Sequence, residues 1–233
     1  ALTTATSTYT RGVVQIRLIY STGEITGPML AASMVWQNAL TLEQEAHFRA
    51  VKDLEEDCII NGNPTSADVG GTTTDEVAFT GLIQSITTNN QNKSSTELAL
   101  DDVRNGFQTI RDARGEPDLI VTDHRTLNRI RALLQEVVRF MGPQETFNFN
   151  IGQTGIIFDG VPVIVSLLMP TAANGRELLI LTVKKGSNIQ MRVLQEPTFE
   201  ELAKTSDSYK FMVKEYVTML IAHENWCQRI RNL

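Results

Sequence analysis

The chain has 233 residues, of which 42% are hydrophobic and 21% charged, and its formal net charge is −6. This length fits one large domain or two small ones, and the composition argues against wholesale disorder. Its two cysteines, Cys58 and Cys227, are too few and too far apart for a disulfide framework. The negative charge argues against a dedicated nucleic-acid reader, and no apolar stretch is long enough to span a bilayer. We therefore expect no membrane partner.

The first twenty residues predict an arm followed by a strand. Residues 1–10 are polar, rich in threonine and without apolar periodicity, which is typical of an extended arm. Residues 12–20 are rich in β-branched and aromatic residues at period two. One face of this strand carries Val14, Ile16, Leu18 and Tyr20.

A hairpin is predicted next. Residues 21–24 are typical of a turn, in which Gly23 would supply a positive φ, and a return strand would begin at Ile25. A two-stranded hairpin alone is marginal in water, so its apolar face needs another surface. That surface is either the chain's own core or another molecule.

Three helices follow from apolar spacing of three and four residues. The first covers 41–60, with a capping-box pattern from Thr41 to Gln44. Its apolar stripe consists of Leu40, His47, Val51, Leu54 and Cys58. The second helix covers 97–113, and Gly115 follows it as the expected C′ residue. Its inward side is formed by Leu100, Val103, Phe107 and Ile110.

The third helix begins after its expected N-cap, Asp123. Its inward residues are Leu127, Ile130, Leu134 and Val137. Strands, or in the first case a strand or turn segment, are predicted at 77–86, 118–122, 156–158, 161–168, 178–183, 189–194 and 211–221. This order of elements predicts an α+β fold rather than regular βαβ alternation.

The sequence offers little catalytic chemistry. Its three histidines, His47, His124 and His223, lie in different predicted elements and form no metal-binding motif. Asp123 and His124 are the most enzyme-like pair, and a small hydrolase built on them is one hypothesis. Helix capping by Asp123 is the better interpretation. We predict no catalytic residue, no metal site and no cofactor, and no enzyme activity.

Seven segments occur in a familiar order along the whole chain: YTRGVVQI (9–16), STGE (21–24), DLEEDCIING (53–62), RGEPDLIVT (114–122), FEELAKTSDS (199–208), EYVTML (215–220) and IRNL (230–233). In this order they resemble the major capsid proteins of tailed bacteriophages, which share the Hong Kong 97-like capsid fold. The first two segments resemble the family's extended loop, the third the end of its spine helix, and the fourth the entry to its axial domain. The last three resemble its C-terminal strands.

The resemblance implies a domain plan for this chain. It places an N-terminal arm at 1–10, an extended-loop hairpin at 11–31, a peripheral domain with the spine helix at 32–114, an axial domain at 115–200 and C-terminal strands returning to the peripheral domain at 201–233. The implied inter-subunit contacts of the hairpin are Val14, Ile16, Leu18, Tyr20 and Ile25. The implied spine-helix residues are Leu42, Val51, Leu54 and Cys58.

The resemblance also implies a function. Subunits of this family form hexamers and pentamers, and then an icosahedral shell around double-stranded DNA. We therefore expect a homo-oligomeric major capsid protein of the virion that is assembled in the host cytoplasm and encloses DNA without sequence-specific binding. Scaffolding, portal and decoration proteins are candidate partners. The alternative is an encapsulin-type nanocompartment shell that encloses a cargo enzyme.

Overall fold

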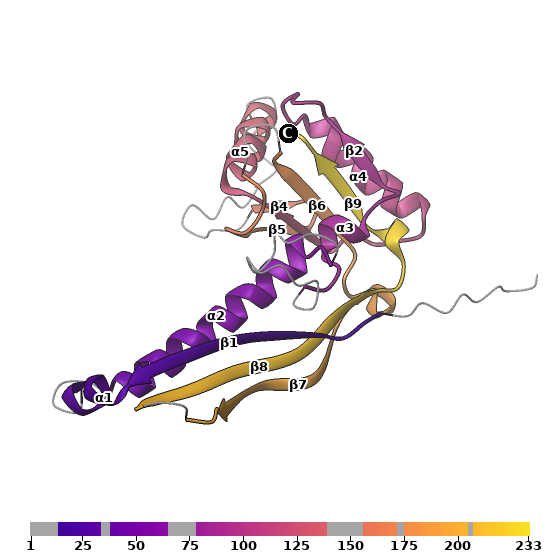
Figure 1. The fold of residues 1–233 in the computed structure, drawn as a ribbon. Coiled ribbons are helices and arrows are strands. Elements are labelled where there is room, and N and C mark those ends of the chain that lie inside the picture. Colours follow the sequence, from indigo (N-terminus) through magenta and orange to yellow (C-terminus); the bar gives the residue numbers. More distant parts are fainter. Residues whose placement is uncertain (1–13, 34–37, 65–77, 139–155, 172–174, 205–206) are drawn as a thin grey trace, which may run out of the picture.

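Two sheets of different shape organise the molecule (Figure 1). The computed structural model describes residues 14–33, 38–64, 78–138, 156–171, 175–204 and 207–233. We call the elongated three-stranded sheet with helices α1 and α2 the long unit. The six-stranded sheet with helices α4 and α5 is the compact unit. The predicted α+β class is confirmed.

The long unit extends away from the compact unit as a sheet backed by one long helix (Figure 1). Its elements are β1 (Arg17–Thr26), α1 (Gly27–Ser33), α2 (Ala39–Asn61), β7 (Ile189–Glu201) and β8 (Ser208–Ile221). The strand order is β1-β8-β7, with both pairings antiparallel. Helix α2 packs on β1 and β8.

The turn predicted at 21–24 is wrong. Strand β1 runs straight through these residues and pairs with β8 from Arg17 opposite Val217 to Thr26 opposite Ser208. Gly23 is needed for close packing, because a Cβ there would lie 2.4 Å from the Phe211 ring and 2.8 Å from the His47 ring. A residue without a Cβ therefore lets α2 and β8 approach β1.

The continuous strand changes the position of Ile25. Side chains alternate between the two faces of a strand, so Ile25 lies on the same face as Ile19. Both side chains are buried in the chain's own core, at 1% and 0% exposed. Ile25 is therefore not available to a neighbouring subunit, contrary to the contact that the resemblance implied.

Helix α2 begins before the predicted Thr41. The side chain of Asn38 accepts a hydrogen bond from the Leu40 amide at 3.1 Å and caps the helix. Val51 and Cys58 are fully buried, as the apolar stripe predicts. Leu42 lies nine residues before Val51, which is half a turn away around the helix, and it is exposed.

The other two long helices belong to the compact unit. Helix α5 (His124–Val138) is capped by Asp123, whose carboxylate accepts from the amides of Arg125 and Thr126 at 3.1 and 3.2 Å, as predicted. Helix α4 (Leu100–Asp112) ends differently from the prediction. Arg114, not Gly115, takes the positive φ, at 66°.

The six-stranded sheet has the order β2-β9-β6-β3-β5-β4. Its strands are β2 (Asn90–Asn92), β3 (Leu119–Thr122), β4 (Ile156–Phe158), β5 (Val161–Val165), β6 (Glu177–Leu181) and β9 (Gln228–Arg231). Asp159 and Gly160 form the turn between β4 and β5, with φ values of 48° and 81°, as a type I′ turn requires. In place of the strand or turn predicted at 77–86, the structure has a short helix, α3 (Leu82–Ser85).

The sheets do not follow the predicted domain boundaries. Helix α4 and strand β2 precede residue 115 but belong with the compact unit, and all but the last residue of β7 falls within 115–200 although β7 lies in the long unit. Strand β9 returns to the compact unit. The chain crosses between the units at the short turns η1 (Lys185–Ser187) and η2 (Glu224–Trp226), so each unit is assembled from distant segments.

Strand β6 joins the cores of the two units. Every residue of β6 is buried. Leu178 and Ile180 pack with α4 and α5, whereas Leu179 and Leu181 pack with residues of α2 and β8. Each fully buried leucine or isoleucine contributes about 1.5–3 kcal/mol. The compact unit and the base of the long unit therefore stabilise each other.

Candidate inter-subunit surface

Large apolar side chains are exposed mainly on the long unit. Nine of the twelve in the described part of the chain lie on it or just before β1, namely Val14, Ile16, Tyr20, Met29, Leu42, Phe48, Val193, Leu194 and Phe199. The other three, Ile157, Ile164 and Leu167, lie on or beside strands β4 and β5 at the edge of the compact sheet. Single exposed apolar residues are ordinary, but their concentration on one elongated unit suggests a contact surface.

One part of this surface is the side of β1 that α2 does not cover. Leu18 and Tyr20 alternate with the buried Ile19, so they lie on the opposite face of the strand. Tyr20 is 42% exposed and Leu18 is half-buried. Val14 and Ile16, directly before β1, are exposed as well. Four of the five residues predicted as hairpin contacts thus stay outside the core, and their contact with another subunit remains a prediction.

A second part of the surface lies on β7 and was not predicted from the sequence. Val193 and Phe199 pair with the buried Val217 and Val213 of β8, so they share the face on which α2 packs. They are nevertheless exposed, at 48% and 44%. A helix is about 10–12 Å wide and strands are about 4.8 Å apart, so one helix covers only two strands. The third strand, β7, is left uncovered.

Helix α2 also carries most of the net charge of the chain. It holds six carboxylates, those of Glu43, Glu45, Asp53, Glu55, Glu56 and Asp57. Only two cations, Arg49 and Lys52, oppose them, so the helix has a net charge of 2 − 6 = −4, compared with −6 for the chain. The long unit is therefore apolar on parts of its sheet and acidic on its helix.

One group of side chains has the order of a nucleophile, a base and an acid. The Ser21 Oγ lies 2.7 Å from His47 Nδ1, and His47 Nε2 lies 3.6 Å from a Glu43 oxygen. However, the His47 ring packs edge-on against Phe211, with centroids 5.3 Å apart, and also covers Gly23. We interpret these residues as a polar connection between α2 and β1. The other candidate pair has no such geometry, because Asp123 is a helix cap and His124 is exposed.

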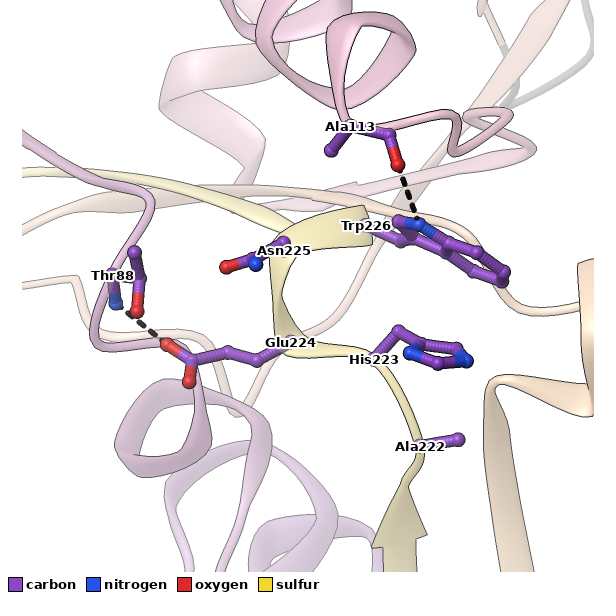
Figure 2. A pocket seen from close by; sticks show the side chains of 7 residues that line it. All are labelled: Thr88, Ala113, Ala222, His223, Glu224, Asn225 and Trp226. Atoms are coloured by element: carbon purple, nitrogen blue, oxygen red, sulfur yellow. Dashed lines mark hydrogen bonds between the residues drawn. The ribbon is translucent and has the colours of Figure 1, made fainter. Parts of the chain in front are cut away.

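A pocket of about 570 Å³ lies at the turn η2, where the chain passes from β8 to β9 (Figure 2). It is lined by Thr88, Ala113, Ala222, His223, Glu224, Asn225 and Trp226. The Trp226 indole donates to the Ala113 carbonyl at 2.9 Å, and the His223 ring packs on it at 4.3 Å (Figure 2). These contacts fix the end of α4 to the crossover between the units.

Glu224 supplies the other contact of this pocket. One of its oxygens accepts hydrogen bonds from the Thr87 hydroxyl at 2.8 Å and the Thr88 amide at 2.6 Å. Burial alone would raise the pKa of Glu224, but these hydrogen bonds outweigh it and hold the pKa below its usual value. We therefore interpret the pocket as a junction that holds the two units together.

Metal and thiol chemistry find no support in the described residues. No group of three or more His, Cys, Asp or Glu among them could hold a metal ion. Cys58 and Cys227 are both buried thiols. Burial raises the pKa of Cys58 to about 12 and that of Cys227 to about 11, so both are protonated thiols at neutral pH. No described helix has the length and apolar character needed to cross a lipid bilayer.

The chain has the Hong Kong 97-like capsid fold, since solved shell proteins superpose on it along most of its length. The SrpI encapsulin of Synechococcus elongatus PCC 7942 superposes with a TM-score of 0.70 at 14% identity, over 94% of this chain and 74% of that one. The capsid of cyanophage A-1(L) superposes with a TM-score of 0.68 at 12% identity, over 93% of this chain and 77% of that one. The capsid of Myoviridae phage XM1 superposes with a TM-score of 0.62 at 10% identity, over 94% of this chain and 74% of that one.

The chain belongs to the SU10 major capsid protein family, whose sequence profile matches residues 5–233. No curated protein matches the sequence significantly. The protein is thus a capsid shell subunit that assembles with copies of itself, as the resemblance implied. The encapsulin alternative shares the fold but has less support, because the family match is to a viral capsid protein.

Proposed function

We propose that the subunits form hexamers and pentamers, which close into an icosahedral shell around double-stranded DNA. In this proposal the long unit is the peripheral domain, with α2 as its spine helix, and the compact unit is the axial domain. The observation that carries the proposal is the concentration of exposed apolar side chains on the long unit. An elongated unit that one helix cannot fully cover gains stability when neighbouring subunits complete its packing.

Many weak contacts suffice for such a shell. Apolar burial contributes about 25 cal/mol per Å², so each small contact is worth little alone. Once a subunit is held at one contact, its next contacts form at high effective concentration, and closure of the shell multiplies the gain. Outward residues such as Tyr20, Leu194 and Phe199 are the contacts that we expect to contribute most.

The charge of the chain supports DNA as the content. DNA binding through phosphates needs cationic surface, whereas this chain has a net charge of −6, four units of which lie on α2. An acidic wall encloses DNA without binding particular sequences and without retaining it. Scaffolding, portal and decoration proteins, and assembly in the host cytoplasm, complete the proposal.

Electron microscopy of the purified full chain tests this function. We expect shells from the parent protein, and loss of shells from the variant Tyr20→Ser/Leu194→Ser with an unchanged circular dichroism spectrum. The matched control Asn105→Ser/Gln108→Ser, on exposed positions of α4, should still form shells. Deletion of residues 13–30 would not be a clean test, because it removes the buried Ile19 and Ile25.

Two outcomes would contradict the proposal. The first is a parent protein that stays monomeric by light scattering under every assembly condition. The second is a normal yield of shells from the Tyr20→Ser/Leu194→Ser variant. For particles that do form, the content separates the two kinds of shell: nucleic acid favours the virion, and a co-purifying cargo enzyme favours the nanocompartment.

A further inference from the structure

Two carboxylates share one ammonium group between α2 and β8. The Lys52 Nζ lies 2.6 Å from a Glu55 oxygen and 3.1 Å from a Glu215 oxygen. The Glu215 side chain is 1% exposed and that of Glu55 16%, whereas Lys52 is 40% exposed. We call these three residues the Glu215 cluster.

The Glu215 cluster carries an excess negative charge in a poorly solvated place. When all three groups are ionised, their formal charges add to 1 − 2 = −1. Burial raises the pKa of Glu215, the hydrogen bond from Lys52 opposes this, and repulsion from Glu55 and Glu196 adds to the rise. The net pKa of Glu215 is raised. A single, partly solvated ammonium does not fully compensate two carboxylates.

The surroundings of Glu215 offer little further compensation. From α2 it faces Lys52 and Glu55, and from β7 the charge that acts on it is Glu196. Its partner across the sheet on β1 is the apolar Ile19. Arg17 lies on the same face of β1, opposite Val217, one pair farther along that face. The described neighbours thus add one more carboxylate and one arginine at a distance.

Lys52 itself stays charged over the relevant range. Burial alone would lower the pKa of Lys52, but the hydrogen bonds to Glu55 and Glu215 outweigh it, so the pKa is raised above 10.5. Between about pH 4 and pH 8 the charge of Lys52 is therefore constant. In the Glu215 cluster, titration of the buried Glu215 carboxyl is what changes the net charge of the three side chains.

We propose that Glu215 is a pH-sensitive switch that sets how firmly helix α2 is seated on the sheet of the long unit. With Glu215 protonated, Lys52 pairs with Glu55 alone, the excess charge disappears and α2 is held firmly. With Glu215 ionised, the uncompensated carboxylate favours water over the α2–β8 interface and loosens the helix. This inference concerns the single subunit and does not depend on the content or the symmetry of the shell.

The position of α2 within the long unit links the state of Glu215 to assembly. Helix α2 and strands β1 and β8 form the long unit, whose exposed apolar residues are the candidate contacts with neighbours. A change in the seating of α2 alters the surface that this unit presents. Acid conditions would therefore favour one well-defined subunit shape, and neutral conditions a more variable one.

The direction of the stability effect follows from linkage. The folded-state pKa of Glu215 is raised above its unfolded value of 4.5, so its contribution to stability is fully present at pH values below 4.5. The contribution is lost as pH rises through the folded pKa. Replacing Glu215 by glutamine keeps the side-chain shape and the acceptor for Lys52 but removes the titration.

The test compares the full chain with Glu215→Gln and with Glu200→Gln, which removes a carboxylate on the opposite face of the same sheet. Thermal unfolding and hydrogen exchange of residues 39–61 are measured from about pH 4 to pH 8, with exchange corrected for its intrinsic pH dependence. Light scattering at each pH confirms the same assembly state, and the region around the sequence pI of 5.2 is avoided.

We expect Glu215→Gln to melt about 2–6 °C above the parent at about pH 8 and to match it at about pH 4. The exchange of α2 should quicken with pH in the parent and stay constant in Glu215→Gln. Lys52→Met, which leaves both carboxylates without their cation, should melt lower than the parent near pH 8 and recover part of the loss in acid.

Three results would overturn the proposal. One is a Glu215→Gln protein that melts below the parent at about pH 8. Another is a difference between the two proteins that does not change with pH. The third is a Glu200→Gln protein that reproduces the effect of Glu215→Gln. The exchange of α2 in the unmodified chain is a separate check that needs no variant, and a rate without pH dependence contradicts the switch.

Discussion

The two units bury their apolar residues to different extents. In the compact unit, β6 is buried on both faces, and α4 and α5 cover the sheet, so that exposed large apolar residues are confined to the β4–β5 edge among the described residues. In the long unit, α2 covers β1 and β8 but leaves β7 uncovered. The compact unit thus leaves few large apolar side chains exposed among the described residues, whereas the long unit leaves a surface that we expect neighbouring subunits to cover.

The strongest contrast should come from the same substitution in each unit. Phe107 is 2% exposed in the core of the compact unit and packs against Phe158, with ring centroids 5.6 Å apart. We expect Phe107→Ala to lower the free energy of unfolding by about 3–5 kcal/mol, because it opens a cavity. Phe48→Ala on α2 should cost less than about 1 kcal/mol, because Phe48 is 46% exposed.

Denaturant unfolding of the two alanine variants measures this contrast. Similar losses from both substitutions would show that Phe48 is as important for folding as Phe107, and the contrast between the units would fail. If the two variants differ in the slope of the unfolding free energy against denaturant concentration, the transition is not two-state or the compactness of a state has changed, and the comparison does not hold.

A smaller effect should come from Gly23, which lies toward the α1 end of the long unit. We expect Gly23→Ala to cost about 1–3 kcal/mol, because the new Cβ overlaps the Phe211 and His47 rings. Phe211→Leu in the same chain should recover part of the loss, and Thr22→Ala on the exposed face is the control. Were Gly23 a turn residue with a positive φ, Gly23→Asn would be tolerated better than Gly23→Ala; we expect the reverse.

The junction between the units should respond to acid. The pKa of Glu224 is lowered, so its contribution to stability is present above 4.5 and is lost as pH falls through the lower, folded pKa. Glu224→Gln should therefore cost about 1–2 kcal/mol at neutral pH and nothing in strong acid. Thermal unfolding against pH measures this, with the exposed Glu116→Gln as control. A loss from Glu224→Gln that persists in strong acid would refute the role of its charge.

The smallest effect concerns the thiols. Cys58 on α2 and Cys227 at the junction are both buried and protonated at neutral pH, so a maleimide should label neither in the native protein. Labelling of single-cysteine variants over time compares local opening in the two places. If the long unit is the looser one, Cys58 reacts first; faster reaction of Cys227 would locate the looser region at the junction.

Local patterns predicted the three long helices well, but neither the short helices α1 and α3 nor the assembly of the units. The stripe of Val51 and Cys58 and the cap at Asp123 depend on neighbours along the chain, and the structure confirms them. The turn at Gly23 was wrong because the true reason for glycine there is Phe211, which is 188 residues away in the sequence (211 − 23). Serine, threonine and glycine together are typical of turns, and only the pairing with β8 overrides this.

The candidate contact surface was predictable in part for a similar reason. The alternation of Leu18 and Tyr20 is visible in the sequence, and so is their exclusion from the core once Ile19 is known to be buried. The exposure of Val193 and Phe199 is not visible, because it depends on which strands α2 covers. Ile25 changed faces because a continuous strand replaced the expected turn.

An electron cryomicroscopy map of the assembled particle would show whether neighbouring subunits cover the apolar surface of the long unit. We expect Tyr20, Leu194 and Phe199 to lose most of their exposure against another copy of the chain. A shell in which these three side chains remain open to solvent would contradict this expectation.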